Sequence, residues 1–246
     1  MGELTGNAVE GTLYWVAPDE FARIRSLAMP AVARARLFAD LARLNVLYMI
    51  ARAGSGHIGS SFSSMELVTW LHLEEMRDGD VYFSSKGHDA PGLYAVLTAL
   101  GRLPADLMHR FRKLGGLPGH PDIGTPGMVA NTGSLGMGIS KAKGMVFADR
   151  RLGRKRRIFV MLGDGELQEG QLWESLVSAA NYKLEEIVAI VDHNKLQSDV
   201  LVKNTSDLGD LEAKFAAFGW SVARCDGHDI EAFSNALRTL AKAEGK

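Results

Sequence analysis

The chain has 246 residues, of which 46% are hydrophobic and 23% are charged, and this composition is typical of a soluble globular protein. Its formal net charge of −1 gives no overall field that would attract nucleic acid or a membrane surface, so we expect neither as a partner. The single cysteine, Cys225, cannot form a disulfide within the chain, and the apolar stretch at 44–54 is too short to span a bilayer. With no signal-peptide pattern, these features predict a cytoplasmic protein.

The N-terminal half reads as helices separated by loops. Residues 1–18 are predicted to be an N-terminal extension, and residues 19–246 a single domain. Leucine spacing predicts a helix from Asp19 to Ala53, which the glycines of AGSGHIGSS (53–61) end. A helix at 64–76, a strand and turn at 78–92 and a helix at 93–101 follow. A Gly- and Pro-rich loop at 113–127 comes next, and glycines then open a helix within 133–153.

The C-terminal half alternates strands with helices. Strands are predicted at 158–162, 187–191 and 220–224, and helices at about 170–183, 208–218 and 229–243, with a polar loop from 192 to about 207. This alternation predicts an α/β fold in which helices cover both faces of a parallel sheet. The basic run at 150–157 has no interleaved aromatic residues, so we interpret it as a solvated turn rather than a nucleic-acid site.

Polar residues follow two of these strands. GDGELQEGQLWE begins at Gly163, directly after an apolar run, and Asn194 follows the next strand. Neighbouring parallel strands lie about 4.8 Å apart, so a right-handed crossover would bring Asp164 and Asn194 to the same edge of the sheet. Oxygen atoms from one carboxylate, one amide and a backbone carbonyl suit Mg²⁺ or Ca²⁺. Gly163 and Gly165 would let the backbone approach a phosphate closely.

Negative charge at this edge explains why a cation is needed. Asp164, Glu166, Asp192 and Asp199 would together repel a bare diphosphate, and a divalent cation between them reverses the sign. The alternative is structural: Asp164 and Glu166 could simply cap the helix that follows.

Four segments resemble motifs of the transketolase family, in the family's order. The stretch from GDGELQEGQLWE to HNKLQSD resembles the thiamine-diphosphate motif, and AGSGHIGSS, SSKGHDAPG and GLPGHPDIGTPGMVANTGSLGMGIS resemble the other three. The resemblance covers about residues 35–235. It implies a thiamine-diphosphate-binding fold, a bound Mg²⁺ or Ca²⁺, and transfer of a two-carbon ketol unit from a ketose donor to an aldose acceptor.

The resemblance also implies roles for particular residues. The implied metal ligands are Asp164, Asn194 and the main-chain oxygen of Leu196. The implied catalytic residues are His57, His88, His120 and, at an interface between chains, Glu169. The implied cofactor contacts are His88, Gly133, Ser134, Leu135, Gly163, Asp164, Gly165, Glu166 and Asn194. His193 and the segment Gln197-Ser198-Asp199 depart from the family pattern beside the metal loop, which leaves their effect on metal binding open.

A complete transketolase also contains a pyrimidine-binding domain and a C-terminal domain, and nothing in this sequence resembles either. We therefore expect the N-terminal subunit of a split transketolase, joined to a C-terminal subunit in an α2β2 heterotetramer or forming a homodimer alone. Whether its C-terminus is natural or truncated stays open. The helix with Leu172, Trp173, Leu176 and Val177 is a candidate contributor to the interface. Sugars or sugar phosphates are the expected substrates, with donor and acceptor open.

Two other functions are possible. One is a non-catalytic protein that binds the cofactor for assembly or regulation, although the intact histidines argue against it. The other is a nicotinamide-dependent dehydrogenase, for which the glycine pattern of Gly133, Gly136 and Gly138 is weak, since no acidic residue ends a strand at the ribose-binding distance.

Overall fold

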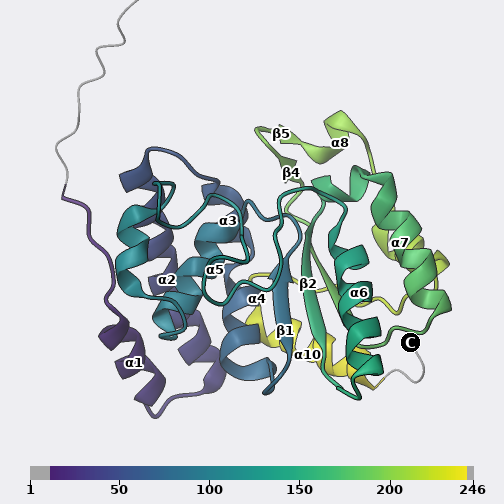
Figure 1. Ribbon diagram of the computed structural model, residues 1–246, viewed down its shortest axis with the longest axis horizontal. Helices are drawn as coiled ribbons and strands as arrows, with labels where there is room; N and C mark the ends of the chain where they lie inside the picture. Colours follow the sequence, from purple (N-terminus) through teal and green to yellow (C-terminus); the bar gives the residue numbers. More distant parts are fainter. Residues whose placement is uncertain (1–11, 243–246) are drawn as a thin grey trace, which may run out of the picture.

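The computed structural model describes residues 12–242, which form an α/β fold around a parallel sheet (Figure 1). Its strand order is β1 (Val81–Ser84), β2 (Ile158–Gly163) and β3 (Ile187–Asp192). Ile158 pairs with Ile187, and Gly163 pairs with Asp192, so β2 and β3 end at the same edge. The predicted fold class is confirmed.

Helices cover both faces of this sheet. Helices α6 and α7 lie on one face, and α2, α4, α5 and α10 pack on the other. The α-helices are α1 (Pro18–Ser26), α2 (Ala31–Ala53), α3 (Ile58–Ser63), α4 (Met65–Trp70), α5 (Ala90–Ala99), α6 (Gly138–Arg151), α7 (Gly170–Asn181), α8 (Val202–Thr205), α9 (Leu211–Ala217) and α10 (Ile230–Ala241). The short elements are the π-helix η1 (Leu71–Glu75), the 3-10 helices η2 (Ala105–Arg110) and η3 (Gly165–Gln168), and the antiparallel pair β4 (Leu196–Gln197) and β5 (Val200–Leu201).

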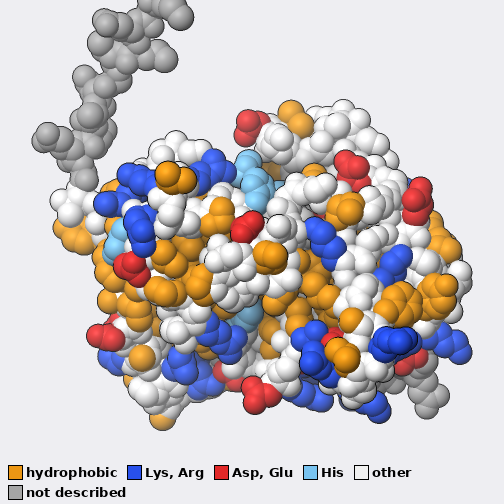
Figure 2. All heavy atoms as spheres, in the orientation of Figure 1, with side chains coloured by type: hydrophobic (Ala, Val, Ile, Leu, Met, Phe, Trp, Pro, Cys, Tyr) orange, Lys and Arg blue, Asp and Glu red, His pale blue; other side chains and the backbone are white. Residues whose placement is uncertain are grey.

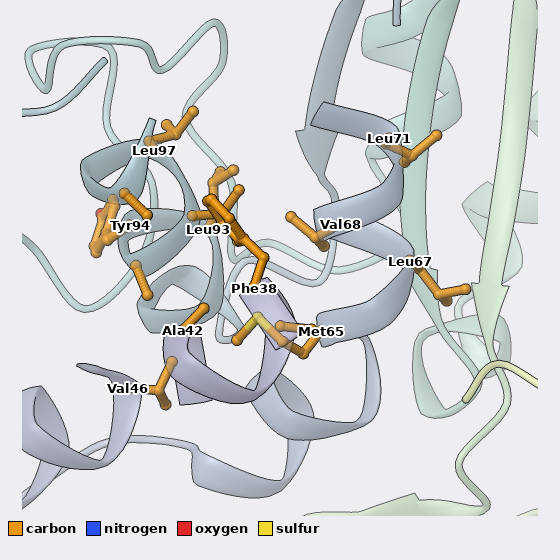
Figure 3. Packing of buried hydrophobic residues seen from close by; sticks show 14 of the residues in the cluster. Phe38, Ala42, Val46, Met65, Leu67, Val68, Leu71, Leu93, Tyr94 and Leu97 are labelled. Carbon is orange, nitrogen blue, oxygen red and sulfur yellow. The ribbon is translucent and has the colours of Figure 1, made fainter. Parts of the chain in front are cut away.

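Alternate side chains of β2 enter two different hydrophobic cores. Phe159 and Met161 belong to the core shared with α2, α4 and α5, whereas Val160 belongs to the core beneath α6 and α7. Figure 3 shows the first of these cores, in which Phe38 of α2 and Met65 of α4 lie between the helices. The strand at the centre of the site is therefore buried on both sides.

The helix predicted from Asp19 to Ala53 is interrupted. It forms two helices, α1 and α2, with Pro30 between them at φ −55° and ψ 141°. Proline has no amide hydrogen and disfavours helical geometry in the residue before it, so the break falls at this position.

The prediction of a strand at 220–224 is wrong. Among residues 12–242, β2 is the strand that pairs with β3, and residues 220–226 have no regular secondary structure. A cavity of about 530 Å³ lies between them, lined by Val188 and Ile190 of β3 and by Ser221, Ala223 and Cys225 opposite. A strand is stabilised by pairing with a neighbour about 4.8 Å away, and this segment lacks that neighbour.

The described part of the expected N-terminal extension is held against α2. The Val16 amide donates to Asn45 Oδ1 at 2.7 Å, and Asn45 Nδ2 donates back to the Val16 carbonyl at 3.0 Å. Trp15 packs edge-on to His109, with ring centres 5.1 Å apart. Residues 1–11 of the extension, and residues 243–246 of the expected domain, lie outside the described residues. Among residues 12–242, we find no helix with both the length and the apolar character needed to cross a membrane.

His72 gives the fold a pH dependence that can be measured. Its Nε2 is buried and has no hydrogen-bond partner among residues 12–242, and its ring packs against Tyr82 with centres 5.2 Å apart. Burial lowers the pKa of His72 to about 3. Below pH 6.5, His72 binds a proton in the unfolded chain but stays neutral in the folded chain. The free energy of unfolding therefore falls as the pH falls through 6.5. Between pH 7 and pH 5 we expect a loss of about 1–2 kcal/mol from this group. Urea unfolding at both pH values, compared with His72→Gln, checks this: an equal pH dependence in the variant would contradict it.

Candidate active site

Asp164 follows directly after β2 at the carboxyl edge of the sheet and is almost fully buried. Its Oδ1 accepts a hydrogen bond from the Gly165 amide at 2.9 Å, and its Oδ2 accepts one from the Lys195 amide at 2.6 Å. Burial raises the pKa of Asp164 above the usual carboxyl value, although these hydrogen bonds oppose the shift. The carboxylate thus ties the end of β2 to the loop after β3.

Glu166 is a second buried carboxylate at this edge. One oxygen accepts from the Gly163 amide at 3.1 Å, and the other accepts from the Gly136 amide at 2.8 Å and from the Ser85 hydroxyl. Burial raises the pKa of Glu166. Three chain segments therefore meet at one side chain, and Glu166 anchors the loops around the site.

The loop after β3 carries Asn194 and continues into the β4–β5 pair. Asn194 Nδ2 lies 3.4 Å from both Ser63 Oγ and Asp192 Oδ2, and its Oδ1 accepts from the Leu196 amide at 2.9 Å. Because Gly163 and Asp192 are paired in register, the structure brings Asp164 and Asn194 to the same edge of the sheet. His193 is exposed beside them.

Three histidines gather where the loops of the N-terminal half meet this edge. His57 immediately precedes α3, and His88 lies in the turn after β1, with their ring centres 5.2 Å apart. Burial, together with nearby His57, lowers the pKa of both His88 and His120, so these rings are neutral near pH 7. Figure 2 shows histidine side chains exposed at the top of the molecule, in a hollow between the helices of the N-terminal half and the region of β4 and β5.

Two glycines bring the histidine loops together. A Cβ on Gly87, which has φ +68°, would come within 2.6 Å of the Gly133 amide nitrogen. A Cβ on Gly133, at φ +113°, would come within 2.7 Å of His120 Cδ2. Any larger residue would push the loops apart, since glycine alone tolerates both the left-handed conformation and the close contact.

Other residues implied by the resemblance lie on the loop before α6 and at the start of α7. Ser134 is exposed and Leu135 is half-buried on the loop before α6. Glu169 is exposed at the start of α7, next to Gly136, where a Cβ on the glycine would come within 2.7 Å of Glu169 Cβ. Within residues 12–242, no hydrogen bond joins the Glu169 side chain to the three histidines.

Sequence reasoning missed the partner of Asp192. Lys86 is 1% exposed, and its Nζ lies 2.6 Å from Asp192 Oδ2. The expected repulsion between Asp192 and a diphosphate is therefore balanced by a buried ammonium group. The available signal was a lysine directly after an apolar strand, because a buried lysine needs a carboxylate partner.

The oxygen donors at this edge fit a divalent cation that takes further ligands from another molecule. Asp164, Asn194 and the Leu196 carbonyl offer one carboxylate, one amide oxygen and one backbone oxygen. In the described part of the chain, no group of three or more His, Cys, Asp or Glu side chains is arranged to hold a metal alone. A diphosphate would supply both the missing oxygen atoms and the missing negative charge.

The sequence and the fold are similar to those of known transketolases. Residues 34–246 match the family described as "Transketolase, thiamine diphosphate binding domain". One of the subunits of the apulose-4-phosphate transketolase of Actinobacillus succinogenes is 38% identical over 196 residues, covering 75% of this chain and 71% of that protein. The 6-deoxy-6-sulfo-D-fructose transketolase subunit SqwG of a Clostridium species is 36% identical over 219 residues, covering 85% and 80%. Transketolase from Leishmania mexicana has a similar structure, with a TM-score of 0.76 at 27% identity, over 95% of this chain and 36% of that one.

The parallel sheet and the family match over residues 34–246 define a thiamine-diphosphate-binding domain. The chain belongs to the transketolase family. A nicotinamide-dependent dehydrogenase is thereby excluded.

Proposed function

We propose that this chain is the N-terminal subunit of a transketolase and works with a C-terminal partner subunit. It transfers a two-carbon ketol unit from a ketose donor to an aldose acceptor. The observation that carries the proposal is the turn at 86–88, which connects the histidine cluster with the carboxyl edge of the sheet. Its His88 lies against His57, and its Lys86 reaches Asp192 beside Asn194. Two relatives named as transketolase subunits support it.

The strand edge would hold the cofactor. Asp164, Asn194 and the Leu196 carbonyl would bind Mg²⁺ or Ca²⁺, and the Gly165 amide would contact the diphosphate. When bound, thiamine diphosphate supplies the reactive carbon centre that cleaves and forms the carbon–carbon bond. The neutral imidazoles of this chain would bind the sugar hydroxyl groups and move protons on them near neutral pH.

The partner would contact the outward side of α6 and α7. Of the four residues named on α7, Leu172 and Leu176 are fully buried in the core and offer no surface to a partner, whereas a contribution of the helix itself stays a prediction. Phe147 and Tyr182 instead lie exposed on this side, with ring centres 5.3 Å apart, and Val177 is also exposed. Such an exposed apolar group fits a surface that another protein chain covers.

Dependence on a partner is the direct test. Alone, the full chain is expected to bind thiamine diphosphate weakly and to show no ketol transfer. With the C-terminal subunit from the same genome, turnover should appear together with an α2β2 mass in solution. A coupled ketol-transfer assay and a mass measurement check both points. The donor panel should include apulose 4-phosphate and 6-deoxy-6-sulfofructose, the compounds named for two relatives.

Two outcomes would contradict this function. Full activity of the lone chain would overturn the split-enzyme proposal. Assembly with the partner and tight cofactor binding, but no transfer with any donor, would favour the non-catalytic role. Tyr182→Ser on the outward face is a matched control, which should weaken assembly while leaving the fold of the chain unchanged.

A further inference from the structure

The turn after β1 buries a lysine beneath the cofactor edge. Lys86 Nζ contacts Asp192 Oδ2 at 2.6 Å, lies 3.6 Å from Asp89 Oδ2, and donates to the Ser60 carbonyl at 3.2 Å. Asp89 Oδ1 has its own partner, the Ser84 hydroxyl, at 2.5 Å. A buried ammonium group is costly unless it is paired in this way. Its closest partner, Asp192, is the one that lies beside the proposed cation ligands.

Asp192 orients one of those ligands. Its Oδ2 accepts from the Ser63 hydroxyl at 2.6 Å and lies 3.4 Å from Asn194 Nδ2. An ionised carboxylate only accepts hydrogen bonds, so the amide nitrogen of Asn194 faces Asp192 and the amide oxygen faces away. Lys86 and Ser63 both donate to Oδ2 of Asp192, so the ammonium group of Lys86 offsets the charge of this carboxylate beside Asn194.

We propose that Lys86 is a positioning residue that makes cation binding at this site depend on the diphosphate. The ammonium group of Lys86 neutralises the carboxylate of Asp192. The carboxylate of Glu166 is occupied by its own hydrogen bonds to main-chain amides. Asp164 accepts two main-chain hydrogen bonds, against three hydrogen bonds at Glu166, and is then the carboxylate at this edge with the most capacity left for a cation; one carboxylate holds Mg²⁺ poorly. The cation therefore binds only with the diphosphate. Without Lys86, Asp164 and Asp192 would attract a divalent cation on their own. This inference rests on the proposed cofactor site.

Titration with Mn²⁺ alone tests it. The full chain is used without partner or cofactor, and free Mn²⁺ is followed by electron paramagnetic resonance. Lys86→Met should bind Mn²⁺ roughly tenfold or more tightly than the natural chain, the scale for one additional carboxylate beside a divalent ion. The double variant Lys86→Met/Asp192→Asn should lose that gain. A folded Lys86→Met with unchanged Mn²⁺ affinity, or a gain that persists in the double variant, would overturn the proposal.

A melting-temperature measurement tests the proposal even if Lys86→Met folds poorly. Addition of Mn²⁺ should raise its melting temperature, because a ligand that binds only the folded state stabilises it, and should leave that of the double variant unchanged. No Mn²⁺-dependent shift in Lys86→Met would overturn the proposal equally. These measurements need no ketol-transfer activity. Failure of the partner assay with a positive Mn²⁺ result would therefore reject the function and leave the role of Lys86 standing.

Discussion

Replacing Asp164 with alanine is expected to abolish Mg²⁺-dependent binding of thiamine diphosphate in the assembled enzyme. The change removes the carboxylate at the centre of the strand edge, together with the acceptors for the Gly165 and Lys195 amides. Loss of a direct metal ligand should lower cofactor affinity by at least about 100-fold, more than the loss of an outer partner does. The core residues of β2 are untouched, so the fold should persist. Calorimetry at saturating Mg²⁺ measures the affinity, and circular dichroism checks the fold.

Asp199 offers the matched control. It is an exposed aspartate in the turn between β4 and β5, on the same loop region but without a hydrogen bond to the strand edge among the described residues. Asp199→Asn should bind the cofactor within about twofold of the natural chain, as surface substitutions usually do. Undiminished affinity in Asp164→Ala would remove Asp164 from the metal site.

The second large effect is expected at His120. Its ring packs on Gly133 and lies near His57, whereas the proposed cation ligands follow β2 and β3. His120→Ala should lower kcat/KM for ketol transfer by roughly 100-fold or more, which is the scale for losing a positioned proton-transfer group. Cofactor affinity should change little, because the strand edge keeps all of its donors. Steady-state kinetics with the partner subunit, together with cofactor calorimetry, separates the two effects.

His228 serves as the control for His120. It is also exposed, but it lies before α10, where its ring contacts Glu66 at 3.0 Å. His228→Ala should leave kcat/KM nearly unchanged. Equal losses in both variants would indicate a general effect on the fold, and no loss in His120→Ala would exclude His120 from the mechanism.

Local pattern predicted the parts of this fold that depend on neighbours in sequence. The apolar runs before Gly163 and before Asp192 form the buried strands β2 and β3, because a strand covered on both faces needs continuous apolar side chains. Parallel pairing then brings Asp164 and Asn194 to one edge without further information. The sequence signal for the break at Pro30 was also present, since proline interrupts a helix.

Other parts depend on residues far apart in the chain. Lys86 and Asp192 are separated by 106 positions, and only the folded sheet brings them within 2.6 Å. Ser85 and Gly136 likewise meet through Glu166, and no periodicity encodes that meeting. The segment at 220–224 has the composition of a strand, yet a strand also requires a neighbour at pairing distance. Such long-range pairings are set by tertiary structure, which explains why single-sequence reasoning did not find them.

The gap beside β3 gives this sheet an open edge. A second cavity of about 210 Å³ lies where β3 starts at Ile187 and α10 ends at Ala241, and the larger cavity lies between β3 and residues 220–226. Along this side, no strand within residues 12–242 pairs with the amide and carbonyl groups of β3, which lie beside an apolar wall. An edge of this kind is a template on which an apolar strand can add by main-chain hydrogen bonding. Left open, such an edge favours self-association of copies as concentration rises, and a strand added beside β3 would oppose it.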